Sequence, residues 1–182
     1  MQLYDYSDKA ATVQVPRCIP RDENDHFAKW RKGHETSHGQ SVMVLEKCEH
    51  GDLFDFMQLH GQIRDGKLLK FLFIQVCQAL NALHTQANLA HMDIKLENIL
   101  VGSDGNLKLC DFGMVESVDS DLIKRQGTEM YMAPEIIDKR HGETYRGVPA
   151  DIFALGVLLW ILAFGTPPFA EASSRDRNYS IL

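Results

Sequence analysis

Three side chains that carry oxygen atoms surround one short unit of this sequence. Asp93 and Asn98 precede an apolar run, and Asp111 follows a second apolar run. The spacer between the runs, residues 102–106, reads Gly-Ser-Asp-Gly-Asn and is a strong turn signal. The runs are therefore predicted to form a β-hairpin, which would bring these three side chains together at its open end. Such oxygen ligands suit Mg²⁺, which proteins usually hold with one or two carboxylates plus substrate phosphates.

Three motifs carry this geometry in a fixed order. His91 to Asn98 resembles the catalytic loop of protein kinases, and Asp111 to Gly113 resembles the metal-binding motif that follows it. Met132 to Glu135 resembles the motif that closes the activation segment. Each motif alone is a weak signal, but all three with a hairpin between the first two are specific. The chain therefore resembles part of a eukaryotic-type serine/threonine protein kinase domain, starting near Gln2 to Tyr6, which looks like the fourth strand of the small lobe.

The resemblance implies a role for each side chain of this unit, with ATP and Mg²⁺ as cofactors. Asp93 is expected to accept or orient the proton of the substrate hydroxyl. Asn98 and Asp111 are expected to hold the metal ions that bridge the ATP phosphates. Lys95 is expected to neutralise the transferring phosphoryl group. Together with the Gly-Thr pair at 127–128, this lysine favours serine or threonine over tyrosine as the acceptor.

The resemblance also implies a site for adenine and ribose. Glu46 and Cys48 match the hinge, whose backbone groups would meet the adenine edge, and Leu45 falls at the gatekeeper position. Leu100 is expected to form the floor under adenine, and Asp52 is expected to reach the ribose. Plain core packing is the alternative for Leu45 and Leu100, and both interpretations can hold at once.

Two further positions are expected to support the catalytic loop. Asp151 stands at the start of an apolar helix, where it is either an N-cap or the anchor that ties the loop to that helix. His91 is expected to use its ring structurally, against Phe112. The other histidines show no spacing typical of metal ligands.

The surrounding elements favour an α+β fold, mainly the helical large lobe of a kinase with a small remnant of the small-lobe sheet. Apolar residues recur at helical spacing over 67–86, and a short helix is expected to begin near Asp52. Residues 2–6 and 41–45 are strand-like. The run from Ile152 to Phe164 is apolar but shorter than the roughly 20 residues of a membrane span, so it is predicted to be a buried helix.

One partial kinase domain is expected over residues 1–182. Residues 1–46 would be the small-lobe remnant, with a long irregular insertion at about 7–40. The hinge is expected at 47–51, and the large lobe at 52–182, truncated at its C-terminal end. The composition, with 45% apolar and 24% charged residues, is that of a globular domain rather than a disordered chain.

Net charge and cysteine usage restrict the expected partners and location. A net charge of −6 gives no basic footprint for nucleic acid or acidic membranes. The four cysteines are widely spaced and form no CxxC pair, which suits reduced thiols in the cytoplasm, with the nucleus as a second location. The expected partners are ATP and a protein substrate with a serine or threonine acceptor, and neither nucleic acid nor membrane.

Several parts of the family pattern are missing. No glycine-rich loop, third-strand lysine or glutamate partner of that lysine is found, and the sequence stops soon after the Gly-Thr-Pro-Pro-Phe run at 165–169. The chain is therefore expected to be a fragment with weak or no activity alone, in which Glu135 lacks its arginine partner and another protein covers the truncated surface. The alternative is a catalytically inactive kinase-like interaction module. The intact catalytic and metal-binding set argues against that module for the parent domain, and the missing parts argue for it in this chain.

Met92 stands where many relatives carry an arginine that receives an activation-loop phosphate. A thioether has neither a charge nor a hydrogen to donate. Phosphorylation at Ser117, Ser120 or Thr128 is therefore predicted not to switch this protein in the usual way.

Overall fold

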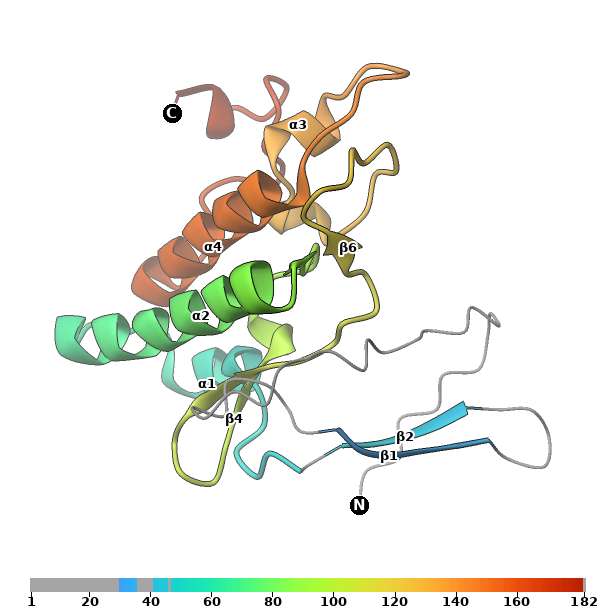
Figure 1. The fold of residues 1–182 in the computed structure, drawn as a ribbon. Coiled ribbons are helices and arrows are strands. Elements are labelled where there is room, and N and C mark those ends of the chain that lie inside the picture. The colour runs from blue at the N-terminus through green and yellow to red at the C-terminus, as the bar shows by residue number, and fades with distance from the viewer. Residues whose placement is uncertain (1–29, 36–40, 46, 182) are drawn as a thin grey trace.

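The computed structural model describes residues 30–35, 41–45 and 47–181 (Figure 1). Within them, the chain forms helices and three small two-stranded sheets, which confirms the predicted α+β, kinase-like fold. The elements are β1 (Trp30–Glu35), β2 (Ser41–Leu45), α1 (Leu53–His60), α2 (Gly66–Gln86), β3 (Leu89–Ala90), β4 (Ile99–Val101), β5 (Leu107–Leu109), β6 (Glu116–Ser117), α3 (Pro134–Ile137) and α4 (Gly147–Phe164). Short 3₁₀ helices cover Leu96–Asn98, Glu129–Tyr131 and Tyr179–Ile181.

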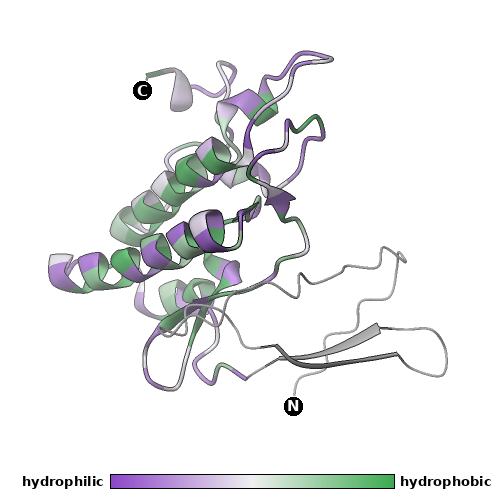
Figure 2. Cartoon of the chain, viewed as in Figure 1, coloured by the Kyte–Doolittle hydropathy of each residue, from purple (hydrophilic) through white to green (hydrophobic). Residues whose placement is uncertain are grey.

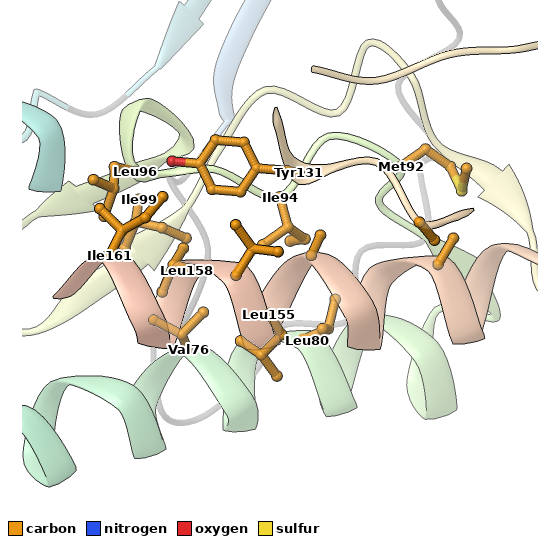
Figure 3. Close-up of a cluster of buried hydrophobic side chains, with 14 of the residues drawn as sticks. Val76, Leu80, Met92, Ile94, Leu96, Ile99, Tyr131, Leu155, Leu158 and Ile161 are labelled. Atoms are coloured by element: carbon orange, nitrogen blue, oxygen red, sulfur yellow. The ribbon is translucent and has the colours of Figure 1, made fainter. Parts of the chain in front are cut away.

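The long helix α2 forms where the apolar spacing predicted it. Asp65 caps its first turn, since one carboxylate oxygen accepts the N–H of Lys67 at 2.8 Å. Its apolar face is buried against α4, with Val76 and Leu80 facing that helix (Figure 3). Helices α2 and α4 both contribute many of the buried residues of the hydrophobic core.

Helix α4 lies between α2 and the layer that carries the catalytic loop (Figure 3). It begins at Gly147, several residues before the predicted start, because Pro149 is tolerated within a first helical turn. It ends at Gly165, whose φ of 77° provides the left-handed C-cap. By length and composition α4 could span a membrane, but half of it is buried inside the fold. Figure 2 shows that most of its residues are apolar, and the prediction of a buried helix is confirmed on the faces toward the core.

The predicted hairpin is present as β4 and β5. Ile99 pairs with Leu109 and Val101 with Leu107 in an antiparallel register. Gly105, with a φ of 78°, allows the tight turn between them. The hairpin therefore brings the residues before β4 close to the residues after β5, as the turn residues predict.

The N-terminal part of the described chain is a second antiparallel pair. The strand predicted at 41–45 is confirmed as β2, and its partner is β1 at 30–35. The expectation of irregular chain as far as residue 40 is therefore wrong for β1. That segment is polar and contains Gly33, so it lacks the alternation that marks a strand, and its pairing with β2 determines its conformation. The strand expected at 2–6 lies outside the described residues.

Candidate active site

A buried carboxylate beneath the catalytic loop holds its backbone in place. Asp151 accepts the N–H of His91 at 2.7 Å with one oxygen and the N–H of Met92 at 2.8 Å with the other. The ring nitrogen Nε2 of His84 lies 2.8 Å from the first of these oxygens. Asp151 lies in the second turn of α4, so the N-cap alternative is wrong and the anchor alternative is confirmed. Three partners satisfy a carboxylate that is only 1% exposed.

The anchored loop has an unusual backbone conformation. Met92 has a φ of 67°, and Asp111, at the far end of the hairpin, has a φ of 58°. A left-handed conformation is uncommon for a methionine and persists only where surrounding contacts hold it, whereas aspartate adopts it more readily. For Met92, those contacts are the two hydrogen bonds from the loop to Asp151.

His91 is fully buried and links the catalytic loop to the chain after the hairpin. Its Nδ1 accepts the N–H of Asp93 at 3.3 Å, so its Nε2 carries the proton and donates to the carbonyl of Cys110 at 2.9 Å. Burial lowers the pKa of His91 below its ordinary value of 6.5, against the opposing pull of Asp151. Its ring meets Phe112 edge-on, with centroids 5.5 Å apart, as expected.

Asp93 is the centre of a compact polar cluster. Its Oδ2 lies 2.8 Å from the ammonium of Lys95, and its Oδ1 accepts the hydroxyl hydrogen of Thr128 at 2.7 Å. The same hydroxyl accepts a hydrogen bond from Lys95 at 3.1 Å. Burial opposes the Asp93 charge, but Lys95, Thr128 and Asn98 outweigh burial and hold the pKa of that carboxyl below its ordinary value of 3.8. Asp93 is therefore ionised at neutral pH.

The pKa of Lys95 shifts in the opposite direction to the pKa of Asp93. Burial lowers the pKa of its ammonium, yet Asp93 raises it more, so the pKa lies above its ordinary value of 10.5. The more distant charges of Glu97 and Asp111 act in the same sense. Lys95 therefore stays protonated at neutral pH, and the charge of Asp111 contributes to this.

Asn98 and Asp111 lie at the two open ends of the hairpin. The Asn98 amide nitrogen donates to the backbone carbonyl of Asp93 at 2.7 Å and to its Oδ2 at 3.2 Å. Neither bond uses the amide oxygen. The N–H of Cys110 donates to the backbone carbonyl of Asn98 at 3.0 Å, which joins the two ends, and Asp111 follows with an exposed carboxylate.

This donor set fits Mg²⁺ held jointly with a phosphate-bearing nucleotide. Among residues 47–181, no cluster of three His, Cys, Asp or Glu side chains could hold a metal ion. An amide oxygen from Asn98 and a carboxylate from Asp111 are the hard ligands that Mg²⁺ takes when phosphates and water complete its shell. These two residues would hold the metal.

Two of the residues expected around adenine and ribose, Leu100 and Asp52, lie at one edge of the hairpin. Leu100 forms an antiparallel bridge with Asp52, and the N–H of Val101 donates to the Gly51 carbonyl at 2.9 Å. One oxygen of Asp52 caps α1 by accepting the N–H of Asp55 at 2.8 Å. Leu100 is half-buried, so it both packs on the core and presents surface.

Cys110 lies between this edge and the metal ligands. Burial raises the pKa of its thiol to about 12, with further contributions from the charges of Asp111, Cys48 and Asp52. Leu45 ends β2, and Glu46 lies outside the described residues, so the hinge contacts of these two stay predictions.

Sequence reasoning did not place Thr128 in the cluster. It used the Gly-Thr pair only as an indication of the acceptor, whereas the structure places the Thr128 hydroxyl between Asp93 and Lys95. Gly127 permits this approach because its φ is 107° and a Cβ there would lie 2.8 Å from the Met92 carbonyl. The Gly-Thr pair was the only sequence signal for this contact. The partners of Thr128, Asp93 and Lys95, lie more than thirty residues upstream, so the local sequence does not reveal it.

Comparisons with known proteins agree with this geometry. The chain is 39% identical over 176 residues to maternal embryonic leucine zipper kinase of Danio rerio, covering 94% of this chain and 25% of the relative. It is 36% identical over 143 residues to serine/threonine-protein kinase CHK1 of Saccharomyces cerevisiae, covering 75% and 27%. It is 37% identical over 130 residues to NUAK family SNF1-like kinase 2 of Homo sapiens, covering 70% and 20%.

The chain thus spans between 20% and 27% of the length of these relatives. A family model described as the protein kinase domain matches residues 30–182. That match includes the catalytic loop, the hairpin and the polar cluster around Asp93. The chain belongs to the protein kinase domain family.

Proposed function

We propose that this chain carries the catalytic part of a serine/threonine protein kinase, which transfers the γ-phosphoryl group of ATP to a protein serine or threonine hydroxyl. The observation that supports this most directly is the cluster in which Asp93, Lys95 and Thr128 contact one another within 3.1 Å. The names of the relatives, serine/threonine kinases among them, support the same acceptor class.

The residues of the cluster have complementary roles in this proposal. Asp93, kept ionised, would orient the substrate hydroxyl and accept its proton. Lys95, held 2.8 Å from Asp93, would offset negative charge on the phosphoryl oxygens. Thr128 fixes both side chains through one hydroxyl, so little reorganisation is needed when a substrate arrives.

Asn98 and Asp111 would hold the metal. When bound, Mg²⁺·ATP supplies the phosphoryl group and the metal charge that offsets its oxygens. Because the Asn98 amide nitrogen makes the hydrogen bonds to Asp93, its amide oxygen would remain available as a ligand. On the nucleotide side, Leu100 and Asp52 would contact adenine and ribose, and Cys48 and Glu46 would supply hinge backbone groups.

The direct test measures Mg²⁺-dependent ATP binding and label transfer to a basic protein substrate with the purified chain. Asp93→Asn is expected to keep ATP binding but reduce transfer by at least about 10². Asp111→Asn is expected to weaken Mg²⁺-dependent binding itself. Asp138→Asn, an exposed carboxylate outside the cluster, is the matched control and should change neither.

The rate of the 182-residue chain alone is expected to be low. Loss of one preorganised charge contact to the reacting group typically costs about 10²–10³ in rate, and the sequence lacks the family's third-strand lysine and glycine-rich loop. Binding without any Asp93-dependent transfer would favour the alternative, a kinase-like interaction module. Failure to bind Mg²⁺·ATP at all would contradict the proposed function.

A further inference from the structure

Helix α2 has an exposed apolar surface on the side turned away from α4. We propose that this surface docks an acidic amphipathic helix of another protein. Four residues, Lys67, Lys70, Phe71 and Ile74, define the surface, which we term the outer face of α2. The proposal goes beyond phosphoryl transfer and does not depend on it.

Two large apolar side chains of the outer face are exposed to solvent. Phe71 is 55% exposed and Ile74 is 41% exposed. At about 100° per residue they lie on the other side of the helix from Val76, which is buried and faces α4 (Figure 3). Being three residues apart, they are neighbours on the helix surface and together offer an apolar anchor to a partner.

The exposed positions follow the spacing of a helix–helix contact. Lys67, Phe71, Ile74 and Gln78 are separated by four, three and four residues, and all four are exposed. This alternation keeps one side of a helix against a neighbouring helix. At a rise of about 1.5 Å per residue, the four positions extend about 16 Å along α2. That length suits one partner helix of about three turns rather than a domain-sized interface.

The charges of α2 determine which kind of helix fits. α2 contains no aspartate or glutamate, and Lys67 and Lys70 border the two apolar side chains. Within the described part of the chain, neither lysine ammonium makes an ion pair or a hydrogen bond. Lys67 also lies in the first turn, where the helix dipole disfavours a cation. Acidic side chains on the partner would pair with these lysines and offset the dipole, whereas a basic partner would be repelled.

Two other occupants fit the outer face less well. A net charge of −6 opposes the approach of the chain to an acidic membrane. A second copy of the chain could present the exposed apolar residues of α4, such as Trp160 and Phe164. However, the one carboxylate of α4, Asp151, is buried and cannot reach the lysines of another molecule. The partner is therefore a different protein.

Fluorescence anisotropy with labelled synthetic peptides tests the proposal. The first peptide has about 18 residues, enough to form a helix, and carries leucines at four–three spacing with glutamates beside them. The second peptide has lysine in place of each glutamate. The unmodified chain is expected to bind the glutamate peptide at least about tenfold more tightly than the lysine peptide, and added salt should weaken that binding.

Substitutions on the outer face provide matched variants. Phe71→Gln is expected to weaken binding of the glutamate peptide by about tenfold. Ile123→Gln, which removes an exposed apolar side chain outside α2, is the control and should leave binding unchanged. Lys67→Glu combined with Lys70→Glu should reverse the preference between the two peptides. This charge reversal alters only exposed side chains, so it keeps the test decisive if Phe71→Gln fails to fold by far-UV circular dichroism.

Four results would overturn the proposal. Two are equal binding of both peptides and no binding of the glutamate peptide at about 1 mM. The third is sedimentation of the chain with phosphatidylserine vesicles that Phe71→Gln abolishes, which would assign the outer face to a membrane. The fourth is self-association that Phe71→Gln abolishes, which would assign it to a second copy. None of these measurements uses ATP, so failure of the transfer assay leaves this test intact.

Discussion

At the scale of single residues, His91 combines burial with two directional hydrogen bonds. It is neutral in the folded chain because its Nδ1 accepts one backbone hydrogen and its surroundings exclude water. In the unfolded chain the same ring would titrate near its ordinary pKa of 6.5. The difference between the two states makes this residue sensitive to pH.

We predict that the free energy of unfolding falls as the pH is lowered from about 7.5 to 5.5. The folded pKa of His91 is depressed, so the unfolded state binds more protons below pH 6.5 and acid favours unfolding, by at most about 1.4 kcal/mol per pH unit. Urea unfolding at several pH values measures the slope. His91→Gln should flatten the slope, and greater stability at pH 5.5 than at pH 7.5 would contradict the prediction.

At the scale of elements, the closing turn of the activation segment depends on Gly127. Its φ of 107° is a conformation that L side chains rarely adopt, and a Cβ would lie 2.8 Å from the Met92 carbonyl. The neighbour is backbone of the anchored loop, so it has little freedom to move.

Gly127→Ala is therefore expected to lower the free energy of unfolding by about 1–3 kcal/mol. The matched control is Gly156→Ala, inside α4, where an added Cβ meets open space and alanine has the better helix propensity. That control should be neutral or stabilising by up to about 1 kcal/mol. Urea denaturation of both variants measures the effects, and equal stabilities would show that the backbone at 127 relaxes freely.

The elements also show why some predictions from sequence succeed. The hairpin of β4 and β5 and the helix α2 follow from local signals, a five-residue turn and an apolar spacing with Asp65 as cap. The role of Asp151 depends instead on where α4 begins and on a partner sixty residues upstream. β1 is too polar to be identified without its pairing partner, since only the register with β2 defines it. Thr128 likewise could not be assigned from sequence, because its role depends on the hydrogen bond that its hydroxyl donates to Asp93.

At the scale of the whole molecule, one side of α4 is apolar and exposed among residues 47–181. Ile152 is 54% exposed and Phe164 is 56% exposed, and Trp160 lies between them, with its ring 4.5 Å from that of Phe164. These positions recur at intervals of four and eight residues and so form one stripe along the helix. Exposed stripes of this kind favour association.

The chain is therefore predicted to self-associate as its concentration rises. Replacing two members of the stripe, as in Ile152→Gln with Phe164→Gln, should shift sedimentation toward the monomer. Leu59→Gln, which removes an exposed apolar side chain from α1, is the control and should leave association unchanged. A monomer at all concentrations before any substitution would contradict the prediction.

The position of Asp151 has a consequence for synthesis on the ribosome. The loop that it orders, at His91 and Met92, leaves the exit tunnel about sixty residues earlier. Until α4 follows, the N–H groups of His91 and Met92 lack the Asp151 carboxylate that accepts them in the folded chain. A growing polypeptide can therefore order the backbone of this loop only after the α4 residue that holds it has been synthesised.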